Sequence, residues 1–76
     1  MALHLGRSRL RYWRNLRGLT QADLANYLGV SQPYISGLEN GKEIPSYELA
    51  ANLAELLEID MKELYEWKSV PGPLRK

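Results

Sequence analysis

Residues 19–42 read LTQADLANYLGVSQPYISGLENGK, and this stretch decides the fold. A helix is expected to begin after Thr20, because threonine is a common N-cap and Asp23 completes a capping box with it. Gly29 predicts the end of this helix, since glycine readily adopts the left-handed conformation of a helix C-terminus. Ser31 follows two residues later and predicts the N-cap of a second helix. The stretch therefore predicts two short helices joined by a sharp turn.

The second helix of this pair is expected over residues 32–39, with Asn40 and Gly41 as its stop. Ala25 lies one turn before the glycine of the turn, where a small side chain lets the next helix approach closely. The apolar contact beneath both helices is supplied by Val30, Ile35 and Leu38. Two helices with this spacing, over about residues 20–40, are typical of a helix-turn-helix, whose second helix enters the major groove of DNA.

Three further helices are predicted around this pair. The first covers about residues 7–17, and its apolar stripe holds Leu10, Trp13 and Leu16. A fourth helix opens at Ser46, and a fifth runs from a capping box at Asp60 to about Trp67. Aromatic residues at helical spacing with apolar neighbours are expected in the core: Tyr12, Trp13 and Tyr27.

These elements predict an all-α fold, with one compact five-helix domain over residues 1–68 and a flexible tail at 69–76. The single histidine, His4, is expected to be a flexible N-terminal residue. The chain has 76 residues and no cysteine, which excludes disulfides and thiolate metal sites. No phosphate loop, nucleophile–base pair or metal-ligand set is present in the sequence. We therefore expect no enzyme activity, no cofactor, no metal and no small-molecule ligand.

Charge divides the chain into two halves. Six basic against two acidic residues give residues 1–42 a net charge of +4, whereas four against seven give residues 43–76 a net charge of −3. Such asymmetry suggests a surface directed at a polyanion, although solvated helix faces would produce it too. There is no apolar run of the ~20 residues that a membrane span needs and no secretory signal. A cytoplasmic protein is expected.

The chain resembles a known family over residues 10–65. The run at 19–42, the Pro45-Ser46 pair and the IDMKELY sequence at 59–65 are similar to the Cro/repressor-type (Xre) helix-turn-helix proteins of phages and bacteria. The resemblance implies a lambda-repressor-like fold with double-stranded DNA as its partner.

The resemblance also implies which residues face DNA. On a helical wheel, the side opposite the core holds the base-contacting candidates Gln32, Pro33, Ser36 and Gly37. Glutamine pairs bidentately with adenine, so Gln32 is the main expected reader. Pro33 and Gly37 depart from the residue types usual in the family. With fewer side chains that can read bases, the protein would either bind DNA with low sequence specificity or gain part of its specificity from DNA shape.

The resemblance implies phosphate contacts for Gln21, Asn40 and Lys42. Tyr34 lies at the edge of the helical wheel, where it could reach a phosphate or a thymine methyl; the alternative is a packed ring with its hydroxyl in water. The resemblance further implies an ion pair between Arg14 and Glu39 that holds the recognition helix against the first helix.

The leading interpretation is a sequence-specific transcriptional regulator, expected to be a repressor that binds a two-fold operator as a homodimer. One thin core cannot bury every apolar residue of the C-terminal half, so a dimer interface is expected from Leu56, Met61, Tyr65 and Trp67. Alternatively, Trp67 folds back on its own domain. Two rival functions are a protein-interaction or antitoxin-like module, and a membrane-surface helix at residues 7–17.

Overall fold

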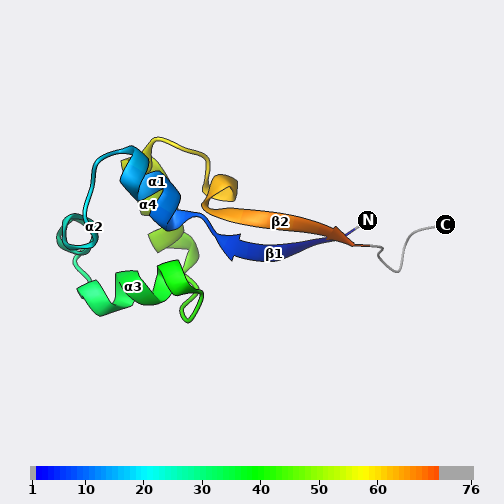
Figure 1. The fold of residues 1–76 in the computed structure, drawn as a ribbon, viewed down its shortest axis with the longest axis horizontal. Coiled ribbons are helices and arrows are strands. Elements are labelled where there is room, and N and C mark those ends of the chain that lie inside the picture. Colours follow the sequence, from blue (N-terminus) through cyan, green and yellow to red (C-terminus); the bar gives the residue numbers. More distant parts are fainter. Residues whose placement is uncertain (1, 71–76) are drawn as a thin grey trace.

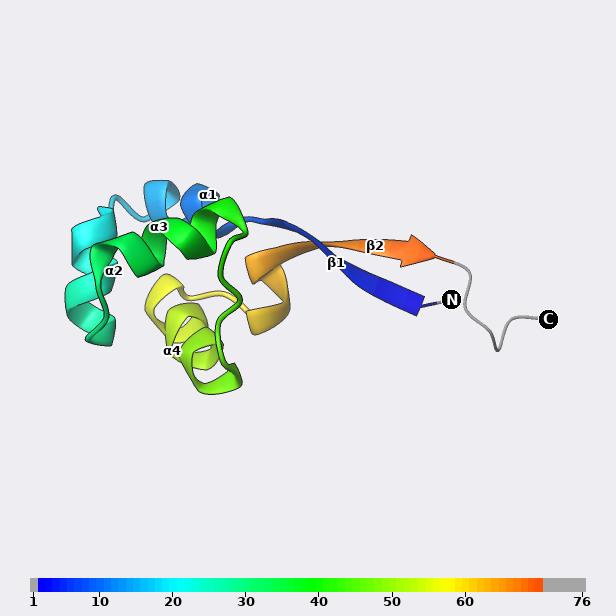
Figure 2. The ribbon, with the colours of Figure 1, turned by 90° about the horizontal axis from the view of Figure 1, so that it is seen from below.

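The computed structural model describes residues 2–70, which form a helical body with a two-stranded ribbon projecting from it (Figure 1). The elements, in chain order, are β1 (Ala2–Ser8), α1 (Leu10–Leu16), α2 (Gln21–Leu28), α3 (Gln32–Asn40), α4 (Tyr47–Leu57), a 3-10 helix (Met61–Leu64) and β2 (Tyr65–Val70). Seen from below, α3 lies across the front of the body and the ribbon leaves at one end (Figure 2). No helix among residues 2–70 is long and apolar enough to cross a bilayer.

The ribbon corrects the expected all-α fold with five helices. β1 and β2 pair antiparallel, from Ala2 opposite Val70 to Ser8 opposite Tyr65, with an irregularity between Leu5 and Ser8. The expected fifth helix is a single 3-10 turn, after which the chain becomes extended. The physical reason is that β2 has a partner strand, and its sequence YEWKSV alternates apolar and polar side chains over its first four residues.

Segments expected to be flexible therefore take part in the fold. His4 belongs to β1, opposite Lys68, and the first two residues of the expected tail belong to β2. The remainder of that tail, residues 71–76, lies outside the described residues. The expected first helix is also shorter, because the chain at Arg7 is still in β1 and α1 begins only at Leu10.

The helix boundaries follow the caps. Thr20 accepts a hydrogen bond from the backbone N–H of Asp23 and returns one to its carboxylate, as a capping box does. Ser31 and Ser46 cap α3 and α4 with one bond each: their hydroxyl oxygens accept hydrogen bonds from the backbone N–H groups of Tyr34 and Leu49, without the return bond of a capping box. Gly29 ends α2 at φ 71°, a left-handed conformation that costs glycine little. The capping predictions are confirmed at all these positions.

The core lies between α2, α3 and α4, with one contribution each from α1 and the 3-10 helix. Its buried members are Leu10, Leu24, Ala25, Ile35, Leu38, Leu53, Leu57 and Leu64. Trp13 packs against this cluster as expected, but three predicted core residues are more than half exposed: Tyr12, Leu16 and Tyr27. The Tyr12 ring instead contacts the guanidinium of Arg9, which lies 4.7 Å from the ring centroid.

A buried carboxylate joins three of the helices. The Glu39 side chain of α3 is fully inaccessible, and its Oε2 accepts a 2.6 Å hydrogen bond from Nε of Arg14 on α1. Its Oε1 accepts from Gln21 of α2 at 3.0 Å and from Arg11 of α1 at 3.2 Å. Arg14 also donates to the carbonyl of Leu19, before α2. The two predicted partners Arg14 and Glu39 are thus in contact, within a larger network.

This network determines the charge state of Glu39. Burial raises the pKa of the carboxyl, but hydrogen bonds from Arg14, Gln21 and Arg11, together with the positive charge of Arg14, outweigh burial and hold the pKa below its ordinary value. The carboxylate therefore stays charged in the folded protein. Taking two ions out of water is costly, and it is repaid here by several charge-assisted hydrogen bonds.

Glu39→Gln is expected to lower the free energy of unfolding by roughly 2–4 kcal/mol, because it leaves the Arg14 charge without its counter-ion. A folded-state pKa below the unfolded one contributes stability that is present at neutral pH and is lost as pH falls through the folded-state pKa. Urea unfolding at several pH values should show a gap between wild type and variant that is constant near neutrality and narrows in acid. Exposed Glu55→Gln on α4 is the control, expected within ~0.5 kcal/mol of wild type. Equal stability of both variants at pH 7 would contradict this account.

Candidate nucleic-acid interface

The exposed start of α3 and the start of α2 form a polar concave surface. Gln21, Gln32, Pro33 and Ser36 line a hollow of about 420 Å³. The Gly29 turn permits this arrangement, because it lets α3 cross α2 with the N-terminal ends of both helices at the same side of the body (Figure 2). Three of the four base-contacting candidates thus lie together, beside one phosphate-contacting candidate.

Hydrogen bonds tie this surface to the interior. The Gln32 amide donates to Oε1 of Gln21 over a long 3.4 Å, and the Gln21 amide donates to Oε1 of Glu39 at 3.0 Å. The buried carboxylate therefore fixes which way the Gln21 amide points. Gln32 keeps one N–H and its carbonyl oxygen for another partner, which is the donor–acceptor pair that an adenine edge requires.

Gly37 departs from the expected arrangement. The residue is buried, and the backbone N–H groups of Lys42 and Glu43 donate to its carbonyl oxygen at 2.9 and 3.1 Å. A β-carbon at this position would lie 2.8 Å from Cγ of Glu43. The chain that returns after α3 covers this position, so Gly37 faces Glu43 and not an open surface.

The phosphate-contacting candidates differ in their surroundings. Lys42 and Asn40 are exposed at the C-terminal end of α3, whereas Tyr34 is half-buried against the core. The half-burial of Tyr34 agrees with the alternative of a packed ring. Asn40 donates to Oγ of Ser36 and accepts from Arg11, both at 3.4 Å.

Arg11 was not among the sequence candidates. Its side chain is 60% exposed, and it reaches α3 from the same face of α1 as Arg14. The spacing of three residues between these arginines was the available signal, since residues at i and i+3 share a helix face.

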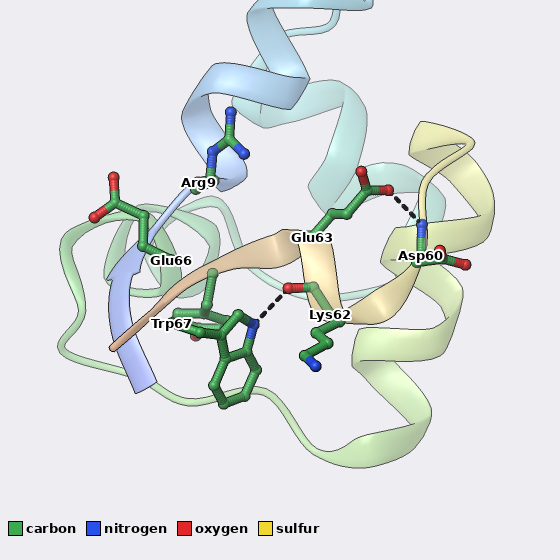
Figure 3. Close-up of a pocket in the computed structure, with 7 residues that line it drawn as sticks. Arg9, Asp60, Lys62, Glu63, Glu66 and Trp67 are labelled. Atoms are coloured by element: carbon green, nitrogen blue, oxygen red, sulfur yellow. Dashed lines mark hydrogen bonds between the residues drawn. The ribbon is translucent and has the colours of Figure 1, made fainter. Parts of the chain in front are cut away.

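A second polar hollow, of about 570 Å³, lies beside the 3-10 helix and the start of β2 (Figure 3). Its acidic and basic side chains come from Arg9, Asp60, Lys62, Glu63 and Glu66. Glu63 accepts from the backbone N–H of Asp60, and the indole N–H of Trp67 donates to the Lys62 carbonyl, so these groups serve the local structure. Within residues 2–70, no group of three His, Cys, Asp or Glu side chains is placed to hold a metal ion.

The expected dimer residues are brought together in part. Met61, Tyr65 and Trp67 line an apolar hollow of about 420 Å³, and Leu56 is not in it. Leu56 and Tyr65 pack against the core. Burial raises the pKa of the Tyr65 hydroxyl, and electrostatic repulsion from Tyr34 adds a smaller contribution. Trp67 folds back far enough to bond Lys62 while remaining 40% exposed.

Comparison with known proteins agrees with this geometry. A helix-turn-helix family model matches residues 10–64. An uncharacterized HTH-type transcriptional regulator of Methanocaldococcus jannaschii is 39% identical over 59 residues, which cover 78% of this chain and 89% of that protein. YazB of Bacillus subtilis, also an uncharacterized HTH-type transcriptional regulator, is 36% identical over 56 residues, 74% of this chain and 81% of that protein.

Solved structures show the same arrangement of helices. The restriction-modification controller protein C.AhdI from Aeromonas hydrophila superposes with a TM-score of 0.67 at 38% identity, covering 74% of this chain and 85% of that chain. A putative DNA-binding protein from Bacteroides fragilis gives a TM-score of 0.74 at 26% identity, covering 86% and 100%. These four proteins carry names of regulators or DNA-binding proteins and not of enzymes. With its capped helix pair, its glycine turn and a match over residues 10–64, the chain belongs to the Cro/repressor-type family of helix-turn-helix proteins.

Proposed function

We propose that the protein is a sequence-specific DNA-binding transcriptional regulator, a repressor that places α3 in the major groove of a two-fold operator. One observation carries the proposal: an exposed Gln32 is hydrogen-bonded to Gln21, which a buried carboxylate orients. An amide pair presented at the start of a helix has the donors and acceptors that base edges and phosphates require. A module that binds proteins alone has no need for this set.

The proposal divides the surface into two roles. Gln32, Pro33 and Ser36 line the hollow at the start of α3 and are assigned to base edges. Gln21, Asn40 and Lys42 are assigned to phosphates on either side, with Gln21 at the N-terminus of α2, where free amides favour an anion. Gly37 is left out of base contact because Glu43 covers it. Base readout then rests mainly on Gln32, which leaves a share of specificity to DNA shape.

The proposal includes a homodimer. One recognition helix with one strong reader selects too few base pairs, and a two-fold pair doubles the sequence that is read. Half-sites about 10 bp apart place both recognition helices on one face of the duplex.

On a duplex with two such half-sites we expect two copies to bind, and analytical ultracentrifugation of the complex measures this stoichiometry. One copy bound to a selected site without two-fold symmetry would contradict the homodimer.

Gln32→Ala is expected to weaken specific binding by about 1–3 kcal/mol and to relax the preference at one base position in each half-site. Binding selection from random duplexes, followed by sequencing, measures both effects. The control is Asn52→Ala, which removes an exposed amide on α4, away from this surface. If wild type selects no site at all, the regulator proposal fails. If the variant selects the same site as wild type, Gln32 is not the reader.

Lys42→Ala is expected to reduce affinity evenly across sequences, because a phosphate contact carries no sequence information. The loss of one neutralised phosphate should also make the slope of log affinity against log salt shallower by about one unit. Fluorescence anisotropy on one operator and one unrelated duplex, at several salt concentrations, measures this. Lys68→Ala, a lysine of the ribbon, is the matched control with an unchanged slope. An unchanged slope for Lys42→Ala would place its ammonium group away from the DNA backbone.

A further inference from the structure

We propose that the apolar hollow at the base of the β-ribbon is the surface that binds a second copy of this chain, with Ile44 of each copy entering the hollow of the other. This deepens the homodimer that forms part of the proposed function and rests on it. It replaces the expected cluster around Leu56 by a surface built from the loop after α3, the 3-10 helix and both strands.

The hollow is apolar and lacks a cover among the described residues. It has a volume of about 420 Å³ and is lined by Leu5, Ile44, Pro45, Ala50, Met61, Lys62, Leu64, Tyr65 and Trp67. Three of these are large apolar side chains that the fold leaves exposed: Leu5 at 42%, Ile44 at 62% and Trp67 at 40%. Exposed apolar residues gathered at one place mark an interaction surface, whereas single scattered ones do not.

The β-ribbon lies outside the region that the family model matches. The matched region is residues 10–64, and the strands lie on either side of it, at Ala2–Ser8 and Tyr65–Val70. Leu5 and Trp67 face each other across the ribbon and form one wall of the hollow. A two-stranded ribbon is marginally stable by itself in water, so contacts to another surface add to its stability.

The chemistry of the hollow fits an apolar partner side chain. The indole N–H of Trp67 donates to the carbonyl oxygen of Lys62 at 2.7 Å, as Figure 3 shows. Its hydrogen-bonding atom is therefore satisfied within the chain, and the exposed remainder of the ring is apolar. A partner that covers it needs to supply no hydrogen bond.

A second copy is the occupant because the surface is self-complementary. Ile44 lines the hollow and is largely exposed, so a two-fold axis beside it would place each Ile44 against the hollow of the partner. Charges agree with this pairing: Glu43 precedes the exposed Ile44, and Lys62 lines the hollow. The two ion pairs among the described residues are those of Glu39 with Arg11 and with Arg14. The carboxylate of Glu43 and the ammonium of Lys62 are therefore available to pair with each other across the axis.

This surface leaves the DNA-binding side free. The polar hollow of Gln21 and Gln32 shares no residue with it. The ribbon leaves the body beyond the C-terminal end of α3, whereas Gln32 is at the opposite end of that helix (Figures 1 and 2). Two copies joined here therefore leave the polar hollow of each copy uncovered.

The test is the dimer dissociation constant of the full chain in DNA-free solution, measured by sedimentation over a range of concentrations. Ile44→Asp is expected to raise this constant about tenfold or more, because it puts a charge into the apolar hollow. Ile44 is exposed, so the change spares the fold, and circular dichroism checks this. The control is Tyr47→Ser, which alters an 80% exposed aromatic residue outside the hollow and should leave the constant unchanged.

A charge exchange tests the geometry independently of folding. Homodimers of Glu43→Lys and of Lys62→Glu should each be weakened, since like charges then meet twice across the axis. An equimolar mixture of the two variants should form a heterodimer at close to wild-type strength, because both contacts become Lys against Glu. Absence of this recovery would overturn the proposed pairing.

The outcomes separate this inference from the proposed function. A wild-type dimer that Ile44→Asp leaves unchanged overturns the surface but not the homodimer. A wild-type protein that stays monomeric at high micromolar concentration overturns the surface. Failure of a dimeric protein to bind DNA would sink the regulator proposal while the surface stands.

Discussion

The buried carboxylate of Glu39 is the constraint on which the rest of the molecule depends. It sits on α3, and its hydrogen-bond donors come from α1 and α2, so one group determines how three short helices meet. None of these helices exceeds nine residues, and helices this short are not stable alone. Leucine packing supplies most of their stability, but apolar contact is not directional. The directional part, which fixes the angle of α3, comes from charged hydrogen bonds.

This arrangement links the proposed recognition surface to the interior. Gln21 connects the two, because its amide nitrogen faces the buried carboxylate while its oxygen faces Gln32. A change within the core network would therefore reorient a surface side chain without touching the surface. Under the proposed function, affinity for DNA and stability of the fold are therefore expected to be coupled, and mutational effects on the two should be separated by measuring both.

Local signals in the sequence predict the helices well, but they do not predict the strand pair, which depends on residues far apart in the chain. Thr20, Ser31 and Ser46 act within four residues of themselves, so their caps could be predicted directly. The ribbon pairs segments at opposite ends of the chain, and each is too short for its alternation to stand out. Gly37 shows another limit: a helical wheel gives the face of a residue but not the later segment that returns to cover it.

The pairing of Ala2 with Val70 has a consequence for how the chain folds as it is made. On the ribosome β1 emerges before α1–α4, and its partner β2 emerges only after these helices have been synthesised. Helix contacts link residues close in sequence and form early, whereas closing a loop of nearly the whole chain is slow. β1 therefore spends the period of synthesis with unpaired backbone groups, as an open strand edge. Its glycine, arginine and histidine limit self-association of that strand during this interval, because they interrupt an apolar run.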